Sequence, residues 1–184
     1  MLFQKWVLSL MLLLQPAAVT PWASTYEQTA TAIAEAAQDS PVFMGEKGAS
    51  RTAALLVAVA WHESRFDQQA LGDCTAGKPK TRTACASWGL FQMNKHNFVV
   101  PGEFALGDPA IASREALRMV RISFRVCRGR PLDEQLAWYA AGNRGCDRGL
   151  RESRNRMGLA KTIESKHPFD ANGVFEELLA EGTW

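Results

Sequence analysis

Glu63 is the residue of this sequence that is best placed for acid–base chemistry. It follows a run, residues 53–61, in which every side chain is apolar, and such a run predicts a helix that is buried on all its faces. At the exit of a buried helix a carboxyl group loses hydration and meets the negative end of the helix dipole, and both effects raise its pKa. A carboxylic acid that stays protonated near neutral pH donates protons. We therefore expect Glu63 to be a general acid.

The segment after Glu63 indicates a small separate lobe. Residues 70–86 contain Gly72, Gly77 and Pro79 together with several threonines, a composition that is typical of a loop or a small hairpin. A cysteine stands near each end of this segment, so a disulfide would staple the lobe.

The cysteine pattern favours disulfides over a metal site. An even number of cysteines behind an export signal indicates two disulfides, with three alternative pairings. Pairing between sequence neighbours is favoured because each bond closes a short loop: Cys74 with Cys85, and Cys127 with Cys146. The chain has no Cys-x-x-Cys, and no second histidine follows His62 at the spacing of a zinc-binding helix. We expect neither a metal nor an organic cofactor.

The N-terminal residues 1–24 have the layout of a secretory signal. One charge, Lys5, precedes a mostly apolar run at 6–14 and a stretch with small residues near its end. The apolar run is too short to span a bilayer, so no stable membrane anchor is expected. These features predict a mature domain of residues 25–184, exported across the inner membrane to the periplasm or the extracellular space. The alternative is a buried N-terminal helix.

The charge of the chain does not indicate a nucleic-acid partner. Its formal net charge is +2, and the basic residues are dispersed among acidic ones. Such a surface is compatible with a weak attraction to an anionic polymer such as a cell wall.

Helical patterns dominate the rest of the chain and predict a mostly helical α+β fold. A first helix is expected at about 25–37, with Ser24 or Thr25 as its cap and one apolar face formed by Ala30, Ile33, Ala34 and Ala37. Ser50 is the expected cap of the buried helix. Asp108 followed by Pro109 is typical of a helix start. The further expected helices span about 108–127, 131–141, 147–165 and 173–179, with a loop at 102–107.

Three motifs carry a resemblance to a known family. They are, in order, Glu63-Ser64-x-Phe66, Gly89-Leu90-x-Gln92 and Trp138-Tyr139-Ala140-Ala141-Gly142. Together they resemble the signature of the lytic transglycosylases with a lysozyme-like domain, a group that includes soluble lytic transglycosylases and goose-type lysozymes. The resemblance covers about residues 53–145. It implies a lysozyme-like fold, a monomer, and peptidoglycan glycan strands as the partner.

The resemblance also implies roles for individual residues. Glu63 matches the catalytic glutamate of the family. The residues implied to bind or line the substrate are Ser64, Ser87, Gln92, Tyr139 and Asn143.

This sequence departs from the usual family pattern at three places. Phe91 stands where methionine is usual, Met93-Asn94 replaces an apolar residue that leads to proline, and Ala140 replaces an asparagine. The ending after Gln92 is more similar to the transglycosylases that accompany phage tails and type IV secretion or conjugation systems. A secretion or phage-type assembly is therefore a further expected partner, and Ala140 removes one substrate contact.

The chemistry that the resemblance implies needs a single carboxyl. In the family, the glutamate protonates the glycosidic oxygen and then takes a proton from the sugar's own 6-hydroxyl, which gives a 1,6-anhydro end. A retaining hydrolase would instead need a second carboxyl about 5 Å away. Ser87 stands where animal lysozymes have their aspartate, and no Asp or Glu lies between Asp73 and Gly102.

Two alternatives stay open. An inverting hydrolase would need a base that activates water, and Asp67 or Asp73 would serve if the loop folds back toward Glu63. A secreted peptidoglycan-binding or assembly protein with little activity is the other alternative.

Overall fold

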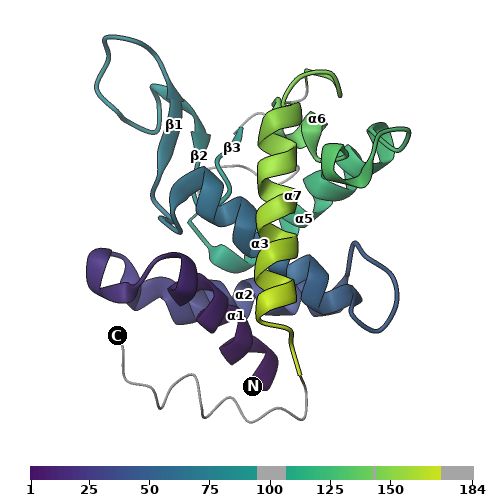
Figure 1. Ribbon diagram of the computed structural model, residues 1–184. Coiled ribbons are helices and arrows are strands. Elements are labelled where there is room, and N and C mark those ends of the chain that lie inside the picture. The colour runs from purple at the N-terminus through teal and green to yellow at the C-terminus, as the bar shows by residue number, and fades with distance from the viewer. Residues whose placement is uncertain (95–106, 143, 171–184) are drawn as a thin grey trace.

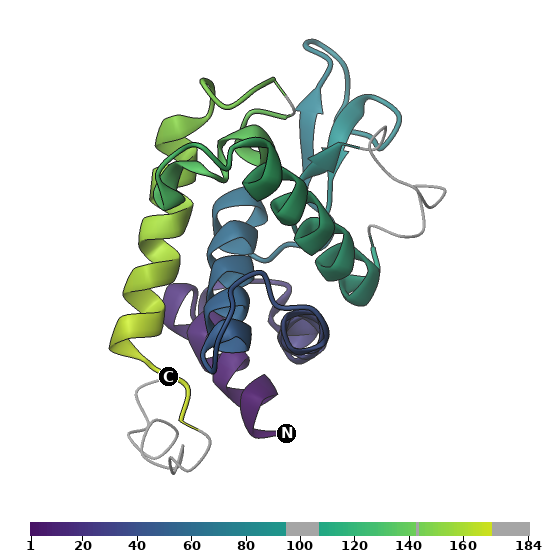
Figure 2. The ribbon, with the colours of Figure 1, turned by 90° about the vertical axis from the view of Figure 1, so that its right-hand side faces the viewer.

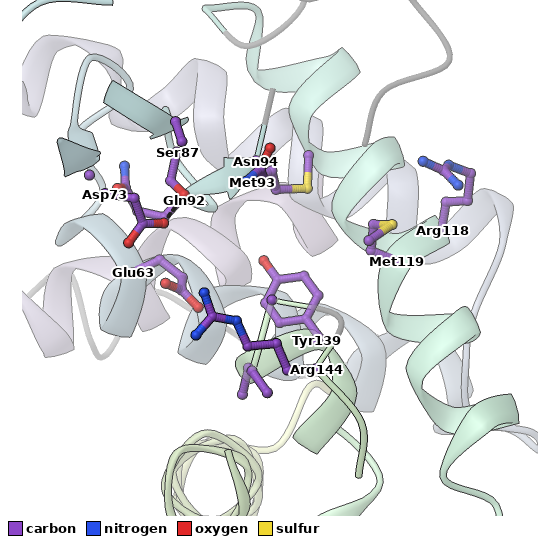
Figure 3. A pocket seen from close by; sticks show the side chains of 15 residues that line it. Glu63, Asp73, Ser87, Gln92, Met93, Asn94, Arg118, Met119, Tyr139 and Arg144 are labelled. Carbon is purple, nitrogen blue, oxygen red and sulfur yellow. Dashed lines mark hydrogen bonds between the residues drawn. The ribbon is translucent and has the colours of Figure 1, made fainter. Parts of the chain in front are cut away.

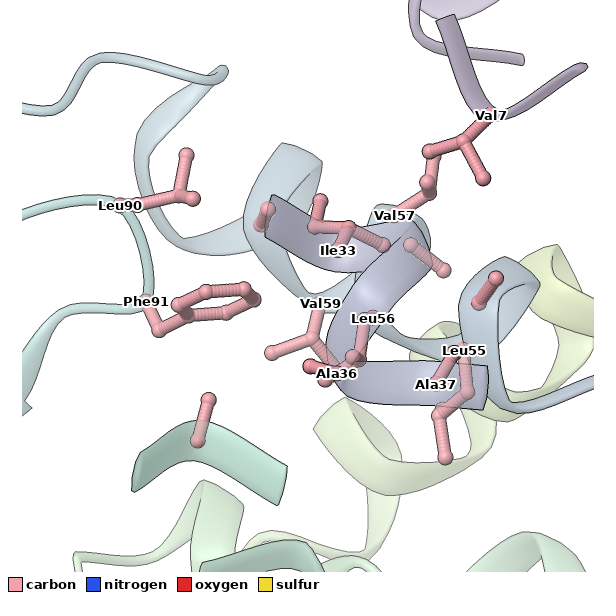
Figure 4. Packing of buried hydrophobic residues seen from close by; sticks show 14 of the residues in the cluster. Val7, Ile33, Ala36, Ala37, Leu55, Leu56, Val57, Val59, Leu90 and Phe91 are labelled. Carbon is pink, nitrogen blue, oxygen red and sulfur yellow. The ribbon is translucent and has the colours of Figure 1, made fainter. Parts of the chain in front are cut away.

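The computed structural model describes residues 1–94, 107–142 and 144–170 of the chain. Its central element is helix α3, Gly48–Ser64 (Figure 1). Every side chain from Ala53 to Ala60 is at most 1% exposed, which confirms the predicted buried helix. Figure 4 shows Leu55, Leu56, Val57 and Val59 of this helix among side chains from neighbouring segments. Glu63 lies in the last turn of α3, at the predicted exit from the core.

Four longer helices surround α3: α1 (Leu2–Leu14), α2 (Tyr26–Asp39), α5 (Pro109–Val126) and α7 (Leu150–Lys166). Helices α1, α2, α5 and α7 all contact α3, and α2 also contacts α1 and α5. In Figure 2, α3 lies between α7 and α5. The predicted apolar face of α2 is buried at all four of its positions. Short helical turns connect these elements: η1 (Ala17–Val19), η2 (Ala23–Thr25), η4 (Leu132–Glu134) and α6 (Ala137–Ala140).

Three short strands form a separate lobe at one end of the helical part (Figures 1 and 2). They are β1 (Leu71–Cys74), β2 (Cys85–Trp88) and β3 (Met93–Asn94), and they form an antiparallel sheet in the order β1-β2-β3. Cys74 is opposite Cys85 in this sheet, and the two are joined by a disulfide. The predicted hairpin lobe and its staple are therefore confirmed, as is a mostly helical α+β chain.

The second disulfide joins Cys127, directly after α5, to Cys146 in the segment before α7. Both bonds connect sequence neighbours, so the favoured pairing is confirmed.

Helix α1 covers an apolar area on α2 and α3 in the uncleaved chain. Its buried side chains include Trp6, Val7, Leu10 and Met11, and the Nε1 of Trp6 donates a hydrogen bond to the His167 carbonyl. Cleavage after residue 24 stays a prediction, and it would uncover the parts of α2 and α3 that α1 contacts. No helix among the described residues is long and apolar enough to cross a membrane.

The predicted start of α3 is wrong. The helix begins at Gly48 after Lys47, and Ser50 lies inside its first turn, where the Ser50 hydroxyl donates to the Lys47 carbonyl. A Cβ at position 48 would lie 2.4 Å from the Phe43 carbonyl oxygen. Because the preceding loop comes this close, glycine, which has no Cβ, fits at the start of the helix. By contrast, Asp108 caps α5 as predicted, since its Oδ1 accepts from the backbone nitrogens of the next turn.

The single helix predicted for 131–141 is also wrong, because the structure has two short pieces, η4 and α6, in its place. Serines of other helices bind the backbone between them. Ser123 donates to the carbonyl of Gln135, and Ser153 accepts from the nitrogen of Leu136. These side-chain bonds compete with the helical pattern, so tertiary contacts override local preference. The predicted loop at 102–107 and helix at 173–179 lie largely or wholly outside the described residues.

Candidate functional site

A cavity of about 620 Å³ opens where the strand lobe meets the end of α3. Its volume is in the range of sites that bind small molecules. Four of the residues predicted for a site line this cavity: Glu63, Ser87, Gln92 and Tyr139. Figure 3 shows that their side chains come from opposite sides of the cavity. Segments that are far apart in the sequence therefore meet around one space.

Glu63 is the buried acid of this cavity. Its side chain is 17% exposed, and the Nη2 of Arg156 on α7 donates to its Oε1 at 2.7 Å. Burial raises the pKa of Glu63, the Arg156 guanidinium lowers it, and the nearby Asp73 carboxylate raises it. The net effect is a raised pKa, the direction predicted from the sequence.

The turn after Glu63 is sharp and holds the acid at the edge of the core. Arg65 and Phe66 both have positive φ angles, 55° and 64°, and Phe66 is fully buried against Tyr26. A bulky residue seldom adopts this conformation. The Ser64 hydroxyl donates to the carbonyls of Ala60 and Leu90, which ties the turn to the second motif. Ser64 thus stabilises the turn after Glu63, and it is not among the residues that line the cavity.

The Gln92 side chain is held in place by hydrogen bonds to two backbone carbonyls. Its φ angle is 44°, and its Nε2 donates to the carbonyls of Ala70 and Gly89 at 3.0 and 3.1 Å. A Cβ on Gly72 would lie 2.1 Å from the Gln92 Oε1. Only a glycine at position 72 therefore leaves room for the Gln92 amide in this orientation.

Tyr139 links the third motif to the second. Its hydroxyl donates to the Phe91 carbonyl at 2.9 Å, and its backbone nitrogen donates to Ser123. Burial raises the pKa of Tyr139 well above its usual value, and the Glu63 carboxylate raises it further. Tyr139 is therefore a neutral hydrogen-bonding group at physiological pH. Asn143, the last predicted site residue, lies outside the described residues.

Asp73 contributes a second carboxylate to the same cavity. It lies on β1, is exposed, and has a φ angle of 51°. The Ser87 hydroxyl donates to its Oδ2, and both residues line the cavity with Glu63 (Figure 3). Asp67, the other base considered for an inverting hydrolase, accepts from the Gln69 nitrogen in a turn and does not line the cavity.

Backbone strain concentrates around this cavity. In the part of the chain that the structure describes, four residues other than glycine have positive φ angles: Arg65, Phe66, Asp73 and Gln92. Two of them line the cavity, and the other two form the turn directly after Glu63. Strained conformations of this kind persist only where surrounding contacts enforce them, and they gather at functional sites.

Sequence reasoning missed the basic residues of the site. Arg156 lies 93 residues after Glu63 in the chain and belongs to none of the motifs. Arg118 and Arg144 line the cavity and were not predicted either. Asp73, by contrast, was named from the sequence as a possible base, and the pairing of Gly72 with Ser87 in the stapled hairpin brings it close to Ser87.

Comparisons with protein-family models, with curated proteins and with solved structures found no match for this chain. The function must therefore be argued from the chemistry of the cavity.

The side chains around the cavity are of the types that could carry out acid–base chemistry on a polar ligand. The cavity combines one desolvated carboxyl, a neutral tyrosine, an oriented amide and a second, exposed carboxylate. Among the residues that the structure describes, no three His, Cys, Asp or Glu side chains gather as metal ligands.

Proposed function

We propose that this chain is a peptidoglycan lytic transglycosylase with a lysozyme-like fold, in which Glu63 acts first as an acid and then as a base. The observation that carries the proposal is the convergence of the three motif segments on one cavity around a single buried carboxyl. The raised pKa of Glu63 supports its role as a proton donor near neutral pH.

The proposed reaction needs no water. Glu63 donates its proton to the oxygen between N-acetylmuramic acid and N-acetylglucosamine, and the bond from C1 to that oxygen breaks. The acetamido oxygen of the muramic residue stabilises the cation-like C1. The Glu63 carboxylate then accepts the proton of the 6-hydroxyl while that oxygen bonds to C1. Because the attack is intramolecular, positioning of the sugar replaces a bound nucleophile.

The other predicted residues have positioning roles in this scheme. Gln92 presents an amide that its own hydrogen bonds orient, and Tyr139 offers a neutral ring and hydroxyl beside Glu63. Ser87 orients the Asp73 carboxylate, and Ser64 holds the turn after Glu63. Asn143 stays a predicted substrate contact.

A hydrolase is the second candidate, and one observation favours it. Asp73 lines the same cavity as Glu63, its backbone has a strained positive φ angle, and its carboxylate accepts a hydrogen bond from Ser87. Strained residues of this kind gather at functional sites. In an inverting hydrolase Asp73 would take a proton from a water that attacks C1 while Glu63 protonates the leaving oxygen.

The proposed setting is the cell wall. An exported domain of residues 25–184 would meet glycan strands as a monomer in the periplasm or outside the cell, in a secretion or phage-type assembly. The motif ending after Gln92 supports the link to such assemblies.

The test is a mass analysis of the soluble products that the mature protein releases from purified peptidoglycan. Transglycosylation gives ends that are one water lighter than reducing ends. Borohydride adds two hydrogens to a reducing end and none to an anhydro end, so it distinguishes the two products independently.

Glu63→Gln should abolish the products, and Glu27→Gln, the same change at an exposed site on α2, should not. Reducing ends that disappear in Asp73→Asn would establish the hydrolase. Binding to peptidoglycan without any product from folded, disulfide-intact protein would establish a binding or assembly protein.

A further inference from the structure

The contact between Glu63 and Arg156 is unusual among the ion pairs of this protein. Both side chains are largely buried, with exposures of 17% and 10%. In each of the other five ion pairs that join two described residues, at least one side chain is 36% exposed or more. Exposed pairs contribute little to stability, whereas a buried pair strongly affects the charge of its members.

The geometry of this pair is one-sided. Arg156 donates from Nη2 to one oxygen of Glu63, Oε1, and its own Nε is buried without a hydrogen-bond partner among the described residues. The other oxygen of Glu63, Oε2, makes no hydrogen bond to a described residue. One oxygen is therefore held by a cation, and the other has no hydrogen-bond partner among the described residues.

Stability alone is a weak explanation for such a pair. A buried ion pair is often no more stable than apolar side chains of the same volume, and the unpaired Nε adds a desolvation penalty. Helix α7 already packs along α3 through buried side chains such as Met157, Ala160 and Ile163.

We propose that Arg156 is a positioning residue that holds Glu63 through Oε1 and stabilises its negative charge between the two proton transfers. This role rests on the proposed function, in which Glu63 must become an anion after it protonates the leaving oxygen. Because Glu63 is largely buried, that anion needs a counter-charge, and without one the acid would release its proton less readily. Oε2, to which Arg156 donates no hydrogen bond, is then the atom that gives and later receives the proton.

Other titratable groups lie near the pair or line the cavity. Asp73 on β1 opposes Arg156, since its carboxylate raises the Glu63 pKa. His62 on α3 has a pKa lowered by burial and then by Arg156 and Arg65, so it is neutral at physiological pH. Arg118 on α5 and Arg144 after α6 line the cavity, and Tyr139 is neutral.

The test separates charge from packing with three variants of helix α7. Arg156→Met removes the charge and keeps a side chain of similar volume. Arg156→Lys keeps the charge but replaces the planar guanidinium by an ammonium group. Arg151→Gln is the control, because Arg151 is on the same helix and 85% exposed. The Glu63 carboxyl is titrated by NMR in protein labelled with ¹³C-glutamate, and Glu63→Gln assigns its signal.

Arg156→Met should raise the pKa of Glu63 and move the alkaline limb of the kcat/KM profile to higher pH by the same amount. Its kcat should fall about tenfold to hundredfold, which corresponds to losing a hydrogen bond to a charged group. Arg156→Lys should restore the titration, and Arg151→Gln should change neither readout. A Glu63 titration and pH profile that are unchanged in Arg156→Met, with only stability reduced, would overturn the proposal.

Two safeguards keep these outcomes distinct. If Arg156→Met does not fold, Arg156→Gln replaces it, because the amide keeps the polarity and loses the charge. The NMR titration needs no substrate, so it is independent of the proposed reaction. A wild-type protein that cleaves nothing, while its Glu63 titration still depends on Arg156, would reject the transglycosylase and leave Arg156 as the group that sets the charge of Glu63.

Discussion

The two walls of the cavity are held in place by different physical means. The helical wall carries Glu63 and Tyr139, which are largely removed from solvent, and Arg156 contacts Glu63 from α7 without lining the cavity. The strand wall carries an exposed carboxylate, Asp73, on a small sheet that is too short to be stable alone. A disulfide and the hydrogen bonds of Gln92 hold this second wall.

Burial therefore controls the pKa values of the side chains on the helical wall. A disulfide and hydrogen bonds fix the positions of the side chains on the strand wall. On the helical wall, desolvation is the largest effect on the pKa of Glu63 and of Tyr139. On the strand wall, the position of Asp73 depends on local covalent and hydrogen-bond constraints. Changes to the two walls should therefore have separable consequences.

The largest expected effect is loss of the acid on the helical wall. Glu63→Gln should lower kcat by roughly 10²- to 10⁴-fold, the usual contribution of a general acid–base group. Circular dichroism should show a folded protein, because the oxygen of the introduced amide can still accept from Arg156. Initial rates of muropeptide release measure the effect, with Glu27→Gln as control. Activity within a few-fold of wild type would remove Glu63 from the mechanism.

The next effect compares the two disulfides. Replacing Cys127 and Cys146 by serine should lower the free energy of unfolding by about 2–4 kcal/mol and leave activity in the folded protein. Replacing Cys74 and Cys85 should instead abolish most activity, because it loosens the strand wall beside the cavity. Denaturant unfolding and product release are measured on both double variants. Equal losses of activity in the two would contradict the division between the walls.

A smaller effect is expected at the Gln92 side chain. Gly72→Ala would push the Gln92 amide away, because the added Cβ would lie 2.1 Å from its Oε1. Loss of its two hydrogen bonds, at about 0.5–1.5 kcal/mol each, should reduce kcat/KM by roughly tenfold. Gly129→Ala is the matched control, since a Cβ there meets no atom within 4 Å. If Gly72→Ala behaves like the control, Gln92 has no role in catalysis.

The smallest effect is a pH shift from the strand wall. The Asp73 carboxylate raises the pKa of Glu63, so Asp73→Asn should lower that pKa and move the alkaline limb of the activity profile to lower pH. The shift should be opposite in sign to that of Arg156→Met and smaller, because Asp73 is exposed and its charge is screened by solvent. The kcat/KM profile of each variant measures both shifts. A shift toward higher pH in Asp73→Asn would contradict this electrostatic assignment.

Much of the fold was predictable because local patterns determine it. The all-apolar run 53–61 predicts a helix in the centre of the core, and Ala53 to Ala60 are buried there, while Trp61 is only partly buried. Asp108 and Pro109 start α5 through a side-chain cap and a preset φ angle. The break within 131–141 was not predictable, because it depends on hydroxyls of Ser123 and Ser153 that other helices bring in.

The sequence by itself was enough to select Glu63 as the proposed acid, together with the other motif residues. Glu63, Gln92 and Tyr139 could be selected because residue types, order and burial pattern are properties of the chain. The sequence also favoured the disulfide between Cys74 and Cys85 over the alternative pairings, because it closes a short loop, and the structure confirms it. Export of residues 25–184 stays a prediction from the same source.

Only the tertiary structure decided which charges surround that acid. Arg156 reaches Glu63 from α7, and no local pattern couples these helices. Asp73 was a candidate from the sequence, but only the fold of the strand lobe places it in the cavity with Glu63. The physical reason is that electrostatic effects depend on distance and burial in space, whereas sequence patterns report on neighbours along the chain. The pKa of Glu63, and with it the proposed chemistry, is therefore set by a balance that exists only in the folded protein.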